Sequence, residues 1–113
     1  MNIVDSSGWL AYFADEINAK HFMAPLSKPT ALIVPAITIY EVFKVILRES
    51  SENEALQAVI AMQKGKVVDL NTPLAIAAAR LSLEHKLPMA DSIILATAQA
   101  FKATIWTQDA DLK

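Results

Sequence analysis

The sequence contains no cysteine and only two glycines among its 113 residues. Without cysteine, the chain can form neither a structural disulfide nor a thiolate metal site, and a reducing compartment is permitted. No P-loop or nucleophile-elbow pattern surrounds Gly8 or Gly65, so enzymes that depend on those motifs are set aside.

A long apolar run and a basic leader are missing as well. No stretch approaches the roughly 20 residues that a membrane helix needs, and MNIVDSSGWL reaches Asp5 before any basic residue, unlike a secretory signal. We therefore expect a cytoplasmic protein without a membrane partner. The formal net charge of −2 provides no overall basic field for nucleic acid, so partners have to be inferred from individual sites.

The chain is instead rich in apolar residues. The hydrophobic fraction is 54%, which supplies the buried surface that disordered segments lack. A chain of this length has room for one core. We expect one domain over residues 1–113.

Short apolar runs closed by turn-forming residues alternate with helical patterns along the chain. The runs predict strands at residues 2–4, 31–34, 66–70 and 104–107. The helical patterns cover residues 9–22 up to the prolines of PLSKP, 35 to about 50, 51–64, 74–86, and the segment opened by Pro88. Ser51 with Glu54 forms a capping pattern and Asn71 or Thr72 caps the next helix, while Gly65 stands at a helix stop.

This alternation predicts a three-layer α/β/α sandwich with a mostly parallel central sheet, because parallel neighbours need crossover helices. The chain ends at Lys113 without a covering element for the last strand. We therefore expect either a missing C-terminal element or an unusually short protein.

Four acids stand at positions that favour a site. Asp5 directly follows the first predicted strand and Asp109 the last, and open parallel sheets bind ligands beyond the carboxyl ends of their strands. Asp91 interrupts the apolar stretch LPMADSIILATAQAF in the first turn of a helix, where an ionised carboxylate gains about 0.3–1 kcal/mol. Glu41 lies on a narrow polar stripe of an otherwise apolar helix, together with Thr38, Lys44 and Arg48.

Each acid also has an ordinary structural interpretation as a turn former, a first-turn helix acid or a surface partner of Lys44. As a set, converging carboxylates repel one another, and protonation or a cation relieves the repulsion. Oxygen ligands without cysteine or a well-placed histidine favour Mg²⁺ or Mn²⁺ over Zn²⁺. Such a site activates water and neutralises phosphate, which is the chemistry of metal-assisted phosphodiester hydrolysis.

The phrases IVDSSGWLAYF, TIYEVFK, LPMADSIILATA and IWTQDADLK, in this order, resemble the PIN-domain family, most closely the VapC-type toxins of prokaryotic toxin–antitoxin pairs. The resemblance spans nearly the whole chain, although the family normally continues into a further helix and strand that are absent here. It implies a dimeric, Mg²⁺- or Mn²⁺-dependent endoribonuclease, held inactive by a cognate antitoxin whose tail enters the acidic cleft. The family acids match Asp5, Glu41, Asp91 and Asp109, with Asp111 as an auxiliary ligand or a loop residue.

We assign hypothetical roles from this match. The three aspartates would hold the metal directly or through water, and Glu41 would ligate it or orient the attacking water. Ser6 and Thr107 would fix carboxylate rotamers or bind a phosphate oxygen. Apart from this match, the bases Lys44, Arg48, Lys86 and Lys102 would provide local contacts to RNA phosphates, with ordinary solvated surface as an equally weighted alternative.

Two other functions stay open. A catalytically silent PIN-like module would use the acidic cleft to capture a basic segment of a partner, but it has no chemical need for all four acids. A DNA or structure-specific nuclease would use the same site, because the chemistry at phosphorus does not distinguish RNA from DNA without contacts to the 2′-hydroxyl.

Overall fold

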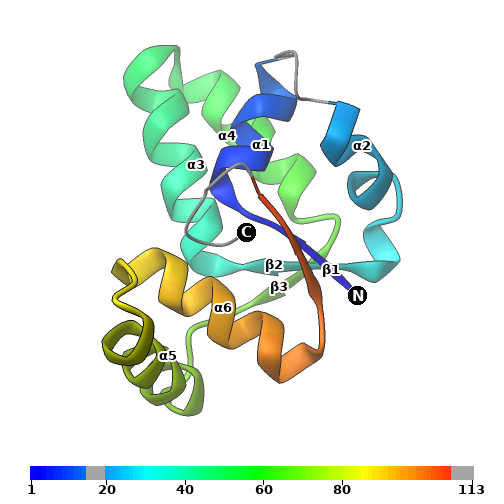
Figure 1. The fold of residues 1–113 in the computed structure, drawn as a ribbon. Helices are drawn as coiled ribbons and strands as arrows, with labels where there is room; N and C mark the ends of the chain where they lie inside the picture. The colour runs from blue at the N-terminus through cyan, green and yellow to red at the C-terminus, as the bar shows by residue number, and fades with distance from the viewer. Residues whose placement is uncertain (15–19, 108–113) are drawn as a thin grey trace.

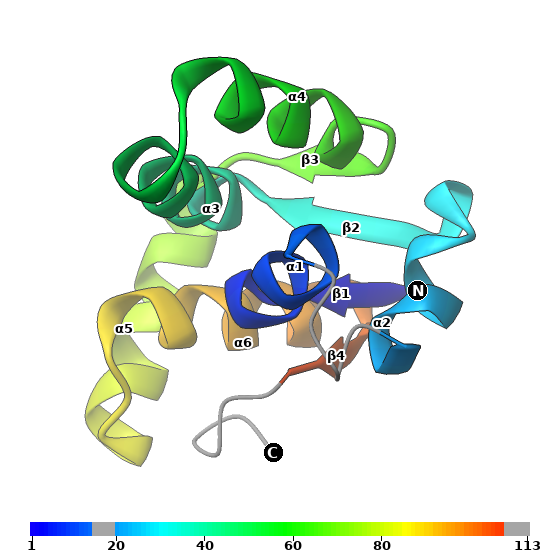
Figure 2. The ribbon, with the colours of Figure 1, turned by 90° about the horizontal axis from the view of Figure 1, so that it is seen from above.

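A computed structural model of the chain describes residues 1–14 and 20–107. Within these residues, the centre of the fold is a four-stranded parallel sheet with the strand order β3-β2-β1-β4. The strands are β1 (Asn2–Val4), β2 (Leu32–Pro35), β3 (Lys66–Val68) and β4 (Thr104–Trp106). Figure 2 shows them in this order, with β1 flanked by β2 and β4.

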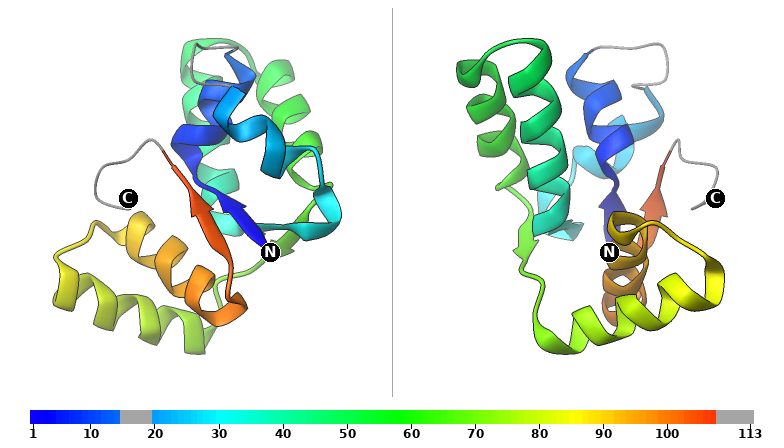
Figure 3. Two further views of the ribbon diagram at one scale, coloured as in Figure 1. Left: turned by 45° about the vertical axis from the view of Figure 1, so that its right-hand side comes forward. Right: turned by 90° about the vertical axis from the view of Figure 1, so that its left-hand side faces the viewer.

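Helices cover both faces of the sheet (Figure 1, Figure 3). The helices are α1 (Ser6–Phe13), α2 (Lys20–Leu26), α3 (Ala36–Glu49), α4 (Glu52–Met62), α5 (Thr72–His85) and α6 (Met89–Phe101), and the 3-10 turn η2 (Pro29–Ala31) precedes β2. The first four helices lie on one face, and α5 and α6 lie on the other. The predicted three-layer α/β/α sandwich is therefore confirmed. In the described part of the chain, no helix is long and apolar enough to cross a membrane.

The two central strands are buried on both faces. Val4 and Val34 point to the core shared with α1–α4, whereas Ile3 and Ile33 pack against Ile94 of α6 on the other face. Side chains in a strand alternate between faces, so a strand covered on both sides needs apolar residues at every position. This is why short apolar runs predicted the strands.

Several local predictions hold. The hydroxyl of Ser51 accepts the backbone N–H of Glu54 at 3.1 Å at the start of α4. Asn71, rather than Thr72, caps α5, because its Oδ1 accepts the N–H of Leu74 at 3.0 Å. Both helices therefore begin directly after a capping residue that the sequence indicated.

The predicted helix over residues 9–22 was wrong at both ends. Helix α1 begins at Ser6 and ends at Phe13, and α2 continues through Pro25 to Leu26. Pro25 does not stop α2, because the N–H of Ser27 still donates to the carbonyl of Met23 at 2.9 Å. Pro25 itself has no N–H and donates no hydrogen bond within α2.

Other boundaries differ from the prediction by one or two residues, and α4 ends at Met62, before the expected stop at Gly65. Strand β3 ends at Val68 instead of residue 70, because the exposed Asp69 and Leu70 leave the sheet at its edge. Gly65 does not adopt a left-handed backbone. Its small size matters instead, since an added Cβ would lie 3.0 Å from the carbonyl oxygen of Leu32.

Candidate active site

Asp5 is the most constrained acid among the described residues. Its side chain is 3% exposed and caps α1. Oδ1 accepts the hydroxyl of Ser7 at 2.7 Å and the N–H of Gly8 at 3.0 Å. Oδ2 accepts the hydroxyl of Thr107. These three donors fix the rotamer of the Asp5 side chain.

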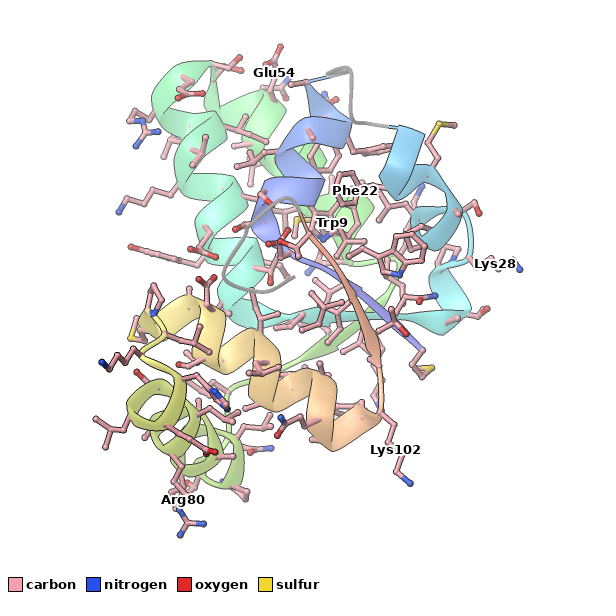
Figure 4. All side chains as sticks on the ribbon, viewed as in Figure 1. Trp9, Phe22, Lys28, Glu54, Arg80 and Lys102 are labelled. Carbon is pink, nitrogen blue, oxygen red and sulfur yellow. The ribbon has the colours of Figure 1, made fainter. Side chains whose placement is uncertain are left out.

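Gly8 allows α1 to lie close enough to β1 for this geometry. An added Cβ at Gly8 would lie 2.6 Å from Cγ1 of Val4 and 2.7 Å from Cε1 of Phe22. Both neighbours are buried in the core between the sheet and α1–α4, where Figure 4 shows Phe22 beside Trp9. The glycine therefore lets the first turn of α1 direct its amide at Asp5.

The sheet topology places Asp5 and Thr107 at a favourable point for a ligand. The chain adds β2 and β3 on one side of β1 and then returns to place β4 on the other side. Residues Asp5 and Thr107 directly follow the two strands that meet at this reversal, and the N–H of Asp5 donates to the carbonyl of Trp106 at 3.2 Å. Crevices at such switch points are the usual ligand sites of open parallel sheets.

Glu41 approaches this point from the second turn of α3. Its side chain is half-buried, and its carboxylate makes a side-chain hydrogen bond with Ser6. Burial raises the pKa of Glu41 above its ordinary value of 4.5, and the neighbouring Asp5 carboxylate raises it further, while the Ser6 hydrogen bond lowers it. The structure therefore brings Asp5, Ser6 and Glu41 together.

The raised pKa of Glu41 predicts that Glu41→Gln stabilises the metal-free protein at neutral pH. Ionisation of Glu41 is harder in the folded chain than in the unfolded chain, so the wild type loses stability as the pH rises above about 4.5, and a neutral Gln avoids this loss. After allowance for solvent screening of a half-exposed group, we expect a rise of roughly 1–4 °C at pH 7. Thermal unfolding in EDTA measures the difference, which should vanish below pH 4.5. A variant no more stable than the wild type at pH 7 would contradict the prediction.

The described part of the chain places no paired cation at these two acids. Within residues 1–14 and 20–107, neither Asp5 nor Glu41 forms an ion pair with lysine or arginine. A nearly buried carboxylate beside a second one calls for a cation or for protonation. Their oxygen donors suit a hard ion such as Mg²⁺ or Mn²⁺, so the residues present fit a divalent metal.

The remaining predicted acids do not complete a cluster in the described structure. Asp91 lies half-buried in the first turn of α6, as predicted. No three acids or histidines of residues 1–14 and 20–107 stand close enough together to hold one metal ion, so Asp91 does not join Asp5 and Glu41 there. Asp109 and Asp111 lie outside the described residues.

The two predicted RNA-contacting cations differ in their surroundings. Lys44 is exposed, with its Nζ 5.6 Å from the centre of the Tyr40 ring. Arg48 is exposed as well, but it pairs with Glu49 at 3.2 Å. Among the described residues, Lys44 therefore has no acidic partner, whereas the charge of Arg48 is offset by Glu49.

Sequence reasoning missed Ser7 and Gly8. It named Ser6 as a residue that fixes a carboxylate, and Ser6 hydrogen-bonds to Glu41, but it did not name Ser7, which donates to Asp5. The contact of Gly8 could have been found from the sequence, because a capping aspartate commonly accepts a hydrogen bond from the backbone N–H three positions on. The link between Ser6 and Glu41 was not readable, because it depends on how α3 docks on α1.

Comparisons with known proteins agree with this fold. Residues 3–113 match the family profile described as the PIN domain. A comparison with curated proteins finds no match. Among solved structures, a toxin–antitoxin complex from Klebsiella pneumoniae is similar, with a TM-score of 0.80, 24% identity, and coverage of 96% of this chain and 87% of that chain.

Two further solved structures share the fold. VapC20 of Mycobacterium tuberculosis, described as a toxin that cleaves the sarcin–ricin loop, has a TM-score of 0.84 at 19% identity over 99% of this chain and 92% of its own. PAE2754 of Pyrobaculum aerophilum has a TM-score of 0.76 at 21% identity over 98% of this chain and 82% of its own.

Proposed function

Because this chain belongs to the PIN domain family, whose members are nucleases that generally use divalent metal ions, we propose that it is a Mg²⁺- or Mn²⁺-dependent endoribonuclease and the toxin of a toxin–antitoxin pair. One observation carries the proposal. The nearly buried carboxylate of Asp5 lies beside Glu41 at the switch point between β1 and β4, without a paired cation among the described residues.

We assign the metal to this acidic pair. Asp5 and Glu41 would hold the ion, with Asp91, Asp109 and Asp111 as the further proposed acids, directly or through water. A bound divalent ion supplies an activated water and neutralises charge on the phosphate. Glu41 would ligate the ion or orient the attacking water, and its side-chain hydrogen bond with Ser6 holds the carboxylate toward Asp5. Thr107 keeps the second oxygen of Asp5 in place through its hydroxyl.

RNA would lie along the outward side of α3. Lys44 is one helical turn beyond Glu41, and Arg48 is two turns beyond it, about 10 Å along the axis. Lysine and arginine at such distances from a metal can neutralise neighbouring phosphates. Lys44 is the stronger candidate, because Glu49 offsets the charge of Arg48.

Two kinds of protein partner fit the surface. A groove of about 660 Å³ lies between α1, α3 and α4, and its lining combines apolar side chains with the acids Glu49 and Glu54. This combination suits a basic amphipathic segment of an antitoxin. We further propose a homodimer, with the exposed apolar side chains of Leu83, Met89 and Tyr40, which are 86%, 70% and 58% exposed, as candidate contacts.

The test is cleavage of a panel of labelled structured and unstructured RNAs. We expect cleavage with Mg²⁺ or Mn²⁺, no cleavage in EDTA, and recovery when the metal is restored. Asp91→Asn should cut at least about tenfold more slowly, as expected when a group that supports a metal is altered. A matched DNA of the same sequence shows whether the substrate is RNA.

Each outcome separates one alternative. Equal cleavage of DNA would replace the ribonuclease with a less selective nuclease. Metal binding by folded protein without cleavage of any substrate would favour the silent interaction module. Cleavage that survives EDTA would overturn the metal-dependent mechanism, and unchanged cleavage by Asp91→Asn would remove Asp91 from the site.

A further inference from the structure

Thr38 carries a buried hydroxyl that the described structure leaves without a partner. Its side chain is fully buried, and Oγ1 makes no hydrogen bond within residues 1–14 and 20–107. Buried polar atoms nearly always have a partner, so each exception calls for an explanation. Two other buried hydroxyls of this chain obey the rule: Thr97 donates to the carbonyl of Ile93 at 2.8 Å, and Ser92 donates to that of Met89 at 2.7 Å.

The position of Thr38 connects it to the acidic pair. Thr38 lies three residues before Glu41 on α3, and side chains three apart on a helix are neighbours, with about 5–6 Å between their Cβ atoms. Strands β1 and β2 pair Ile3 with Ile33, so two residues further along each chain bring Asp5 alongside Pro35, just before α3. Thr38 therefore lies one turn before Glu41 on α3, near the carboxyl ends of the two central strands.

We propose that Thr38 is a positioning residue of the acidic site, and that in the metal-bound protein its hydroxyl donates a hydrogen bond, directly or through one water, to the Glu41 carboxylate that holds the metal. The inference rests on the proposed function. A carboxylate that ligates a metal commonly needs a neighbouring donor to fix its orientation, and loss of that donor weakens metal binding about 10–100-fold. Ser6 supplies one partner to Glu41, and Thr38 supplies a second from the buried side.

The first test replaces Thr38 with Val, which has nearly the same shape but no hydroxyl. In EDTA, we expect Thr38→Val to unfold at the same temperature as the wild type or a higher one, because a buried polar atom without a partner is removed. Isothermal titration with Mn²⁺ should show about tenfold weaker binding. On RNA, kcat should fall while KM stays unchanged.

A matched pair separates the hydroxyl from packing. Thr38→Ser keeps the donor and should bind Mn²⁺ within about threefold of the wild type, whereas Thr38→Ala should bind about tenfold more weakly. This pair also serves if Val disturbs the fold. Thr97→Val is the control, because this buried threonine lies on α6 and bonds its own helix, so its Mn²⁺ affinity should equal that of the wild type.

The outcomes distinguish the inference from the proposed function. If the wild type binds Mn²⁺ through Asp5 and cleaves RNA, but Thr38→Val binds Mn²⁺ equally well, Thr38 has only a structural role and the inference is overturned. If the wild type does not bind Mn²⁺, or if Asp5→Asn binds it as well as the wild type does, the proposed metal site itself fails. The role of Thr38 then fails with it. In the Glu41→Gln background, Thr38→Val should cause no further loss of affinity, and an additive loss would contradict the proposed contact.

Discussion

Asp5→Asn should abolish RNA cleavage, by at least about 10³-fold, and should leave the fold intact. A metal held at Asp5 would supply several kcal/mol of transition-state stabilisation, and every 1.36 kcal/mol corresponds to about tenfold in rate. The variant keeps one oxygen to accept the hydrogen bonds of Ser7 and Gly8. The hydroxyl of Thr107 can accept from the new amide group instead of donating to a carboxylate.

The control for the capping role of Asp5 is Asn71→Ala. Asn71 caps α5 as Asp5 caps α1, but it lies away from the acidic pair. We expect Asn71→Ala to lose about 1 kcal/mol of stability without a change in cleavage rate. Single-turnover cleavage and thermal unfolding, measured on both variants, separate the two effects. If the folded Asp5→Asn variant cleaves RNA at the same rate as the wild type and still requires the metal, Asp5 has no part in the mechanism.

The layers of this fold were predictable because the central strands are covered on both faces. Ile3 and Val4 face opposite layers, and so both are apolar and local pattern alone marks the strand. The order of the strands was not predictable in the same way. The strand order is decided where the chain returns past β1 and places β4 on its other side. That placement depends on contacts between residues distant in sequence, which leave no periodic pattern in the sequence.

The same distinction applies to the candidate site. Asp5 could be selected from the sequence because it directly follows a predicted strand. A residue in that position lies at the edge of a parallel sheet where ligands usually bind. The interaction of Glu41 with Ser6 and Asp5 required the docking of α3 against α1. The lone hydroxyl of Thr38 was visible in the sequence only as one member of a polar stripe, since burial decides its significance.

Gly8→Ala should destabilise the protein by about 1–3 kcal/mol, the usual cost of an extra methyl group in a packed core. The new methyl would meet Val4 at 2.6 Å and the ring of Phe22 at 2.7 Å, and both of these side chains are almost completely buried. For a domain of this size, the loss corresponds to a fall of roughly 5–20 °C in Tm. Because Gly8 also donates its N–H to Asp5, a displaced α1 should weaken Mn²⁺ binding in the molecules that remain folded.

A double-mutant cycle with Phe22→Leu tests the cause of this loss. The smaller side chain makes room for the methyl group, so Gly8→Ala should cost less stability in the Phe22→Leu background than in the wild type. Gly65→Ala is the comparison, because its added Cβ would lie 3.0 Å from β2 and is expected to lower Tm without changing Mn²⁺ affinity. If Gly8→Ala costs the same in both backgrounds, the crowding of Phe22 is not its cause. If it lowers Tm but leaves Mn²⁺ affinity unchanged, the close approach of α1 to β1 serves the core alone and Asp5 does not depend on it.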